Sequence, residues 1–362
     1  MPYRLEAAES IPDALRRVAA EELSSAMRLL DDDSAEGRDK RVHEARKSMK
    51  KLRALLRVAR AALPPATYRH ENVGIRDTGR LLSGLRASAA GLEAFEVLVS
   101  DAPATIEREA IAAARRRILQ AYAQHTEVAS AALPDAAAQL AGALGRVAEW
   151  EIAGSGWTLL RPGLRAIYAR GRRAYKRAAK LRTTEALHDW RKQVKYLWYS
   201  VRLLEPCWPR PLKALAAELA VLGEVLGDDH DLAELEPLLS PPPPEGPLRD
   251  RDPSTAAVGA SVTTGTEGCS SDQPAPTSAA AEGSPPNGPA ATPHEEEAAP
   301  AGPVLALTRA RREALQAQAL RLGKRLYAER PARFTLRLGA YFNGWRRETR
   351  AERGASDPAE GK

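Results

Sequence analysis

Hydrophobic residues recur along most of the chain every three or four positions, which is the period of an amphipathic α-helix. In the first part of the chain this spacing predicts four helical regions: 11–31, 38–62, 66–100 and 104–150. Proline residues end the second region at Pro64-Pro65 and interrupt the fourth near Pro134, because proline cannot continue a helix. A hinge is predicted at Gly154-Ser155-Gly156.

The same order of elements begins again after the hinge. A helix with one apolar face is followed by a second basic helix, which Thr183 or Thr184 can cap. Two further helical regions follow, one starting near Leu212 and one at 304–349. We therefore predict an all-α fold in which an internal duplication produces two pseudo-symmetric four-helix bundles with a central basic groove or pore.

Residues 240–302 interrupt the second bundle. They are dominated by Pro, Ala, Gly, Ser, Thr and Glu, with hardly a large apolar residue. Such a composition cannot bury enough apolar surface to offset the entropy of ordering, so it predicts a disordered insertion. The expected organisation is a first helical half at 1–153, a second half made of 157–239 and 303–350, and a disordered tail at 351–362.

Composition restricts the class of protein. Apolar residues make up 44% of the chain but aromatic residues only 5%, which suits closely packed helices better than sheets. The two cysteines, Cys207 and Cys269, form no disulfide framework or zinc spacing, as is usual in a reducing cytosol. No apolar run is long enough to span a membrane, so we expect a cytoplasmic protein without membrane contact.

The charge of the chain is unevenly distributed. The net charge is +7, but residues 240–302 carry nine acidic and two basic residues, which leaves +14 for the remainder. A strongly basic helical part calls for an anionic partner such as nucleic acid, a membrane surface or polyphosphate.

Two of the predicted helices carry the same basic pattern. An arginine lies three positions after His43 and lysines lie four and seven positions after it, and His188 starts the same pattern 145 positions later. At about 100° per residue, the cations of each helix fall on one face. Like charges at these spacings cost a helix about 0.2–0.5 kcal/mol per pair, so a polyanion that offsets the repulsion is indicated. A solvated basic face remains the alternative for either copy.

At these residues the chain resembles the CHAD family, a helical domain named for its histidine. The resemblance rests on three motifs: His43-x-x-Arg46-x-x-x-Lys50-x-x-Arg53, His188-x-x-Arg191-x-x-x-Lys195 and Leu226-Gly227-x-x-x-Asp231. It covers nearly the whole chain apart from the insertion and the tail. The resemblance implies two four-helix bundles around a basic pore, binding of inorganic polyphosphate, and a place at polyphosphate granules.

The candidate polyphosphate-binding residues are the histidines and the cations of the two basic helices: His43, Arg46, Lys47, Lys50, Arg53, Arg57, His188, Arg191, Lys192, Lys195 and Arg202. Secondary candidates are Arg165, Arg172, Arg173 and Lys213. Arginine can donate two parallel hydrogen bonds to phosphate oxygens, whereas lysine acts as a point charge.

The chain departs from the family pattern at two places. Trp198 stands where the second motif usually has an arginine, and Ala87 stands where the first half would have the aspartate that matches Asp231. The second basic face and the first loop are therefore expected to be weaker. The family often follows a triphosphate-processing domain, and none is expected before the helices here. Since no catalytic or metal motif is evident either, we expect neither an enzyme nor a cofactor.

Two other functions stay open. Basic helices also suit the phosphodiester backbone of nucleic acid, although no base-reading motif is evident. An enzyme acting on polyphosphate or nucleotides would need a metal site or a general acid. Asp228-Asp229-His230-Asp231 resembles a metal cluster, but consecutive helical residues point in different directions.

The two motif histidines predict a dependence on pH. Among so many cations an empty site favours neutral His43 and His188, whereas a bound polyanion favours their protonated forms. Affinity is therefore expected to rise as the pH falls through about 7 to 6. An imidazole that simply donates to a nearby carboxylate or carbonyl is the alternative. Asp231 is expected to hold a basic side chain in place, with an ordinary surface acid as the alternative. The acidic insertion is a further hypothesis: it could occupy the basic groove and compete with the ligand, with a passive linker as the alternative.

Overall fold

The regular secondary structure of the described residues consists of α-helices and one short 3-10 helix. The computed structural model describes residues 3–31, 37–82, 84–100, 102–103, 105–123, 133–240 and 302–356. Within these ranges there is no β-strand, which confirms the predicted all-α class. The segment expected to be a disordered insertion lies, apart from Ser240 and Gly302, outside the described residues.

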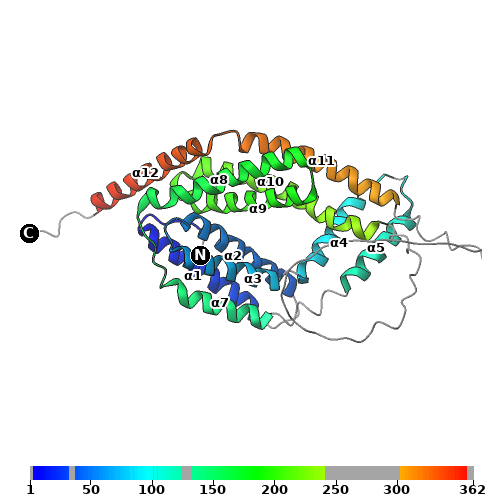
Figure 1. The fold of residues 1–362 in the computed structure, drawn as a ribbon, viewed down its shortest axis with the longest axis horizontal. Coiled ribbons are helices and arrows are strands. Elements are labelled where there is room, and N and C mark those ends of the chain that lie inside the picture. Colours follow the sequence, from blue (N-terminus) through cyan, green and yellow to red (C-terminus); the bar gives the residue numbers. More distant parts are fainter. Residues whose placement is uncertain are drawn as a thin grey trace, which may run out of the picture. The chain divides into compact units, whose positions relative to one another are not determined.

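Four helices from the first part of the chain pack together: α1 (Ile11–Leu30), α2 (Arg38–Ala59), α3 (Pro65–Leu81) and α7 (Leu133–Val147). Both α1 and α3 pack on α2 and on α7 (Figure 1). Ser10 caps α1, since its hydroxyl oxygen accepts a hydrogen bond from the Asp13 amide at 3.2 Å. Leu15, Val18 and Leu52 are fully buried between these helices, as their spacing predicts.

The second part begins with α8 (Gly156–Leu181) and α9 (Thr184–Leu203), followed by the 3-10 helix η1 (Glu205–Cys207). Three helices complete it: α10 (Pro209–Leu239), α11 (Gly302–Leu326) and α12 (Pro331–Ser356). α9 packs between α8 and α10, α11 packs on α10, and α12 packs on α8. Of the two predicted caps of α9, Thr183 is the one observed, accepting from the Ala186 amide at 3.3 Å.

Two predicted helical regions are each divided in the structure. The region at 66–100 consists of α3 and α4 (Gly84–Ser100), and Arg46 donates to the Leu82 carbonyl just after the end of α3. The region at 304–349 consists of α11 and α12, and Pro331 starts α12 because its missing amide is not needed there. α12 continues to Ser356, so residues 351–356 are helical rather than part of the predicted tail.

α4 and α5 (Arg108–Ala123) belong to the first part of the sequence but pack on the second. They contact each other, and both contact α10 and α11. Phe95 of α4 and Ile118 of α5 are fully buried there. The packing of the two parts is thus more intermixed than two independent bundles would require.

The order of the helices supports the predicted duplication. α8, α9 and α10 begin 145, 146 and 144 positions after α1, α2 and α3, respectively. The basic helices α2 and α9 are therefore the second helix of each series. The pseudo-twofold relation between the two series remains a prediction.

α2 lies at the junction of the two parts, where it contacts both α8 and α9. The closest approach is at Gly163 of α8, where an added Cβ would collide with the backbone carbonyl oxygens of Arg57 and Val58. Only glycine permits this approach. The contact holds the C-terminal end of α2 against α8 and so fixes the position of the basic face of α2.

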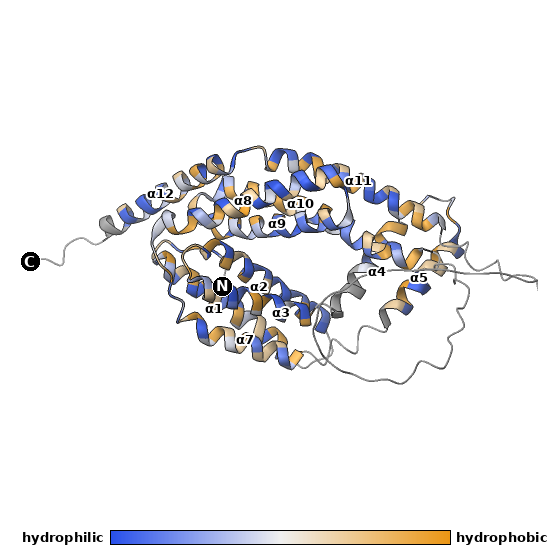
Figure 2. Cartoon of the chain, in the orientation of Figure 1, coloured by the Kyte–Doolittle hydropathy of each residue, from blue (hydrophilic) through white to orange (hydrophobic). Residues whose placement is uncertain are grey.

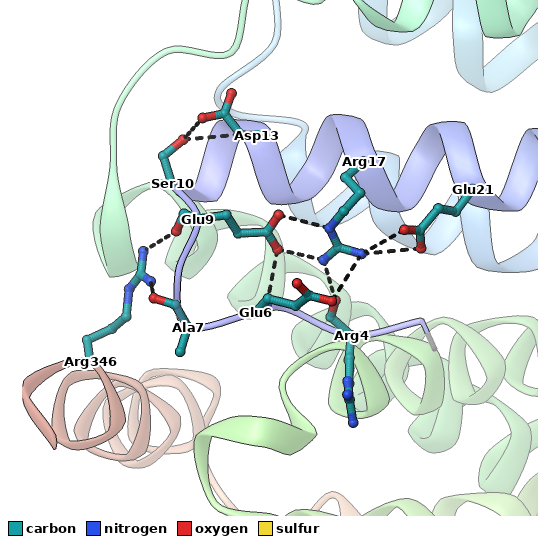
Figure 3. Close-up of polar contacts among 9 residues, drawn as sticks. All are labelled: Arg4, Glu6, Ala7, Glu9, Ser10, Asp13, Arg17, Glu21 and Arg346. Atoms are coloured by element: carbon teal, nitrogen blue, oxygen red, sulfur yellow. Dashed lines mark hydrogen bonds and ion pairs between the residues drawn. The ribbon is translucent and has the colours of Figure 1, made fainter. Parts of the chain in front are cut away.

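A short N-terminal segment connects two helices, α1 and α12 (Figure 3). Arg17 of α1 binds Glu9, and also Glu21 at 3.2 Å. Arg346 of α12 donates to the backbone carbonyls of Ala7 and Glu9, at 2.7 and 2.8 Å. The chain before α1 therefore fastens α12 to α1.

Candidate functional site

Cations from α2 and α9 meet where the two helices pack against each other. Lys50 of α2 shows this most directly. Its pKa is lowered to about 8, first by burial and then by the positive charges of four neighbours: Arg46, Arg191, Lys195 and Lys47. The pKa of Lys195 on α9 is lowered by burial and by Arg191 and Lys47. The structure thus brings together five of the predicted residues from both motifs.

The other cations at the N-terminal end of α2 have protein partners. Arg46 is partly buried, and its Nη1 donates to the Leu82 carbonyl oxygen at 2.7 Å. Burial also lowers the pKa of Arg46. Lys47 pairs with Glu44 at 2.6 Å on the same helix. His43 is partly buried one turn before Lys47.

Arg53 and Arg57 lie against a tyrosine of the other basic helix. The guanidinium of Arg57 is 3.8 Å from the ring centroid of Tyr196, and that of Arg53 is 5.8 Å from it. Nη1 of Arg57 donates to Asn72 Oδ1 at 3.0 Å and to the Arg53 carbonyl at 2.8 Å. Contacts between a cation and an aromatic face hold the guanidinium groups in place without neutralising them.

Two glycines of α10 make room for the cations of α9. A Cβ at Gly223 would lie 2.9 Å from Nζ of Lys195, and a Cβ at Gly227 would lie 3.0 Å from Nη2 of Arg191. The glycines and the cations are each four residues apart, so the spacing on α10 matches that on α9. The side chains of Lys195 and Arg191 can lie directly on α10 because Gly223 and Gly227 have no side chains there.

Trp198, at the position where the family pattern has an arginine, provides a ring surface for two cations. The ammonium of Lys195 and the guanidinium of Arg202 each lie 5.0 Å from its centroid. Lys192 pairs with Asp189 at 3.3 Å. Arg202 therefore shares the Trp198 ring with Lys195 of the central cluster.

A pocket of about 600 Å³ lies beside the α9 part of the cluster. Arg191, Lys195 and Arg311 line it, and no residue of α2 does. Four carboxylates also line it: Glu93, Glu224, Asp228 and Asp231. The remainder of the lining consists of the two α10 glycines and apolar residues of α4, α10 and α11. The volume would suit a small ligand, but the lining is not purely cationic.

The ring of His188 packs against that of His230 of α10, with the ring centroids 4.3 Å apart and the planes tilted by 45°. The pKa of His188 is lowered to about 4, by burial first and then by His230, Lys192 and Arg191. An empty site therefore favours neutral His188, in the direction the sequence predicts. In the empty protein His188 is therefore protonated only well below the expected window of pH 7 to 6, because of burial and of His230, which the sequence did not indicate as a neighbour. The rise of affinity within that window stays a prediction.

The four secondary candidates are not brought to the cluster. Arg165 lines a separate pocket between α8 and α12, and Nε of Arg172 donates to the Tyr327 carbonyl at 3.0 Å. Arg173 is exposed, and Lys213 is 3.8 Å from Glu205. Arg172 thus has a structural role in joining α8 to the end of α11.

The structure pairs Asp229, rather than the predicted Asp231, with a basic side chain. Asp229 is buried and accepts hydrogen bonds from Arg312 at 3.1 Å and Gln316 at 2.9 Å. Arg312 also binds Glu236 at 2.6 Å. Sequence reasoning missed this pair because the two residues lie on opposite sides of the insertion, and it missed Arg311 for the same reason.

No group of three or more potential ligands is arranged to hold a metal ion within the described residues. Among the same residues, no helix combines the length and the apolar character that crossing a membrane requires.

The fold and the site define an all-helical protein in which two related basic helices bring their cations together. The CHAD domain profile matches residues 17–240, which is more than half of the chain, and the chain belongs to the CHAD domain family. This match runs from α1 through α10 and so includes both basic helices. Comparison with curated proteins and with solved structures finds no match.

Proposed function

We propose that this protein binds inorganic polyphosphate through the cations of α2 and α9. CHAD domains are associated in general with polyphosphate binding. The observation that carries the proposal is the convergence of Arg46, Lys47, Lys50, Arg191 and Lys195, whose mutual repulsion helps to lower the pKa of Lys50 to about 8. A bound polyanion would relieve that repulsion. Figure 2 shows that hydrophilic residues make up much of α2.

The ligand offers only charge and shape to a binding protein. Each hydrogen bond between a phosphate oxygen and a charged donor contributes about 1.5–3 kcal/mol, and arginine can make two at once. The glycines of α10 and the rings of Tyr196 and Trp198 position the cations before a ligand arrives. Such preorganisation reduces the entropy that binding would cost.

We expect the double variant K50Q/K195Q to bind long-chain polyphosphate at least tenfold more weakly than the wild type, because it removes one cation from each helix. Isothermal titration calorimetry in fixed salt measures this. The matched control is K180Q/K324Q, which removes two exposed lysines that neither line the pocket nor act on Lys50. Equal losses in the two double variants would show that net charge, rather than this cluster, determines binding.

Nucleic acid is the competing ligand. Its backbone also carries phosphate charge, and its binding falls steeply with salt. We expect duplex DNA to fail to displace polyphosphate at physiological salt. Displacement by DNA at equal phosphate concentration would favour a nucleic-acid-binding protein instead.

We propose that the protein is a binding module rather than an enzyme. The absence of phosphate release from polyphosphate, measured with and without magnesium, tests this.

We also propose that the protein is located in the cytoplasm and at polyphosphate granules. Fluorescence microscopy of the tagged chain in cells that contain granules tests this location, with K50Q/K195Q as the control that should lose the granule signal.

A further inference from the structure

A second cationic cluster lies where the C-terminal end of α2 packs on α8. A pocket of about 240 Å³ is lined there by Arg57 and by two arginines outside the family motifs, Arg60 and Arg170. The other lining residues are small or apolar, and no carboxylate is among them. Arg57 comes from the last turn of α2, Arg60 is the residue that caps the C-terminus of α2, and Arg170 comes from α8, so the two parts of the chain both contribute.

The charges of the two pockets differ in sign. The larger pocket has three cations and four carboxylates in its lining, whereas the smaller one has three cations alone. A polyanion that leaves the central cluster would therefore be repelled on the α10 side and attracted on the α8 side. The larger volume does not make the first pocket the better site for phosphate.

Two arginines of the smaller pocket lie against aromatic rings, which hold them in place without neutralising them. Arg57 stacks on Tyr196, and the guanidinium of Arg60 lies 5.1 Å from the ring centroid of Tyr68. Neither Arg60 nor Arg170 forms an ion pair with any described residue. Their N–H groups are available for an oxyanion, which arginine binds in a bidentate way.

The two clusters lie on one face of α2. Lys50, Arg53, Arg57 and Arg60 follow one another at intervals of three, four and three residues, which keeps them on the same side of a helix. At 1.5 Å per residue, Lys50 and Arg60 are about 15 Å apart along the axis. Arg53 lies between them, so the cationic surface is continuous.

We propose that Arg57, Arg60 and Arg170 form a second phosphate subsite, which binds a distal part of the same polyphosphate chain that the central cluster holds. This inference rests on the proposed function. A chain that spans about 15 Å along α2 engages both clusters, whereas a short polyphosphate occupies one. Linking two contacts in one ligand raises the affinity because the second contact becomes intramolecular. The protein would thus select for chain length.

The test titrates the full chain with tripolyphosphate and with long-chain polyphosphate by calorimetry. The wild type should bind two tripolyphosphate ions and should bind the long chain more tightly. R60Q/R170Q should bind one tripolyphosphate ion and lose the advantage of the long chain by about tenfold or more. R60K/R170K, which keeps the charge, should retain the second tripolyphosphate ion. Circular dichroism verifies that each variant is folded.

Two outcomes would overturn the inference, and they are distinguishable. If R60Q/R170Q matches the wild type with both ligands while K50Q/K195Q weakens both, polyphosphate binding stands and the second subsite falls. If the wild type binds neither ligand, the proposed function and the subsite fall together. R325Q/R333Q, which removes two exposed arginines elsewhere, is the control for net charge.

Discussion

Single residues of the site owe their properties to neighbours from other helices. Lys50 is on the surface, but its pKa is lowered to about 8 by burial of the ammonium and by cations that include Arg191 of α9. His188 is similarly affected by His230 of α10. Each of these shifts favours the uncharged form in the empty protein. Binding of an anion must therefore be accompanied by proton uptake wherever the free group is not already protonated.

We expect polyphosphate affinity to fall as the pH rises above about 8. Below that pH Lys50 is protonated with or without ligand, so it adds no dependence. Above it the free protein loses the proton while the bound anion retains it, and the loss in affinity approaches at most tenfold per pH unit. Calorimetry at pH 7 and pH 9.5 in matched salt measures the change.

The matched variant for this prediction is K50R, because arginine stays protonated throughout that range. It should show a smaller change with pH than the wild type. The remaining dependence would come from Lys195, whose pKa is also lowered. If the wild type binds polyphosphate equally well at both pH values, Lys50 does not contact the ligand.

At the scale of helices, glycine decides how closely the elements approach. Gly163 lets α8 contact the backbone of α2, and Gly223 and Gly227 let the cations of α9 lie across α10. Gly323 plays a related part, since a Cβ there would lie 2.5 Å from the ring of Trp190. A chain with few aromatic residues and many alanines packs by close approach of helices, and these positions fix the distances.

We expect Gly163→Ala to destabilise the protein by about 1–3 kcal/mol, since the new methyl group would have to push α8 away from the α2 backbone. Urea denaturation followed by circular dichroism measures the effect. The control is Gly145→Ala in α7, where no atom lies within 4 Å of the added Cβ. That variant should be stabilised by about 0.5–1 kcal/mol, because alanine is the better helix former. Destabilisation of both variants by the same amount would contradict the argument.

At the scale of the whole molecule, residues on both sides of the insertion build one structure. The described residues before and after the insertion form one compact unit, in which α11 packs on α10 and α5. The polar centre of this junction is the pair of Arg312 and Asp229, whose side chains are only 10% and 2% exposed. Arg312 also donates to Thr184 at 2.9 Å at the start of α9. The network joins the segment after the insertion to the second basic helix.

We expect Arg312→Met to destabilise the protein by about 3–5 kcal/mol, because it leaves the Asp229 carboxylate buried without its cationic partner. The hydrogen bond from Gln316 at 2.9 Å would remain. Urea denaturation measures the change. Arg309→Met, at an exposed position of the same helix, is the control and should be close to neutral. A small effect of Arg312→Met would mean that Asp229 can be solvated.

The sequence alone determined the all-α class, the start of each basic helix and the identity of the central cations. Those features depend on local periodicity and on residue types, which a helix converts directly into faces. The division of the region at 66–100 was not predicted, and neither was the hydrogen bond that Arg46 of another helix makes to the Leu82 carbonyl beside it. The sequence also could not identify His230, Arg170 or Arg312 as partners, since each is distant in the chain from the residue it affects.

Only the tertiary structure decided how the basic faces are completed. It placed Tyr196 beneath Arg57 and carboxylates beside Lys195, and it brought Arg170 to the end of α2. The physical reason is that burial and Coulomb interactions depend on distance in space, whereas a sequence motif records only the order of the residues.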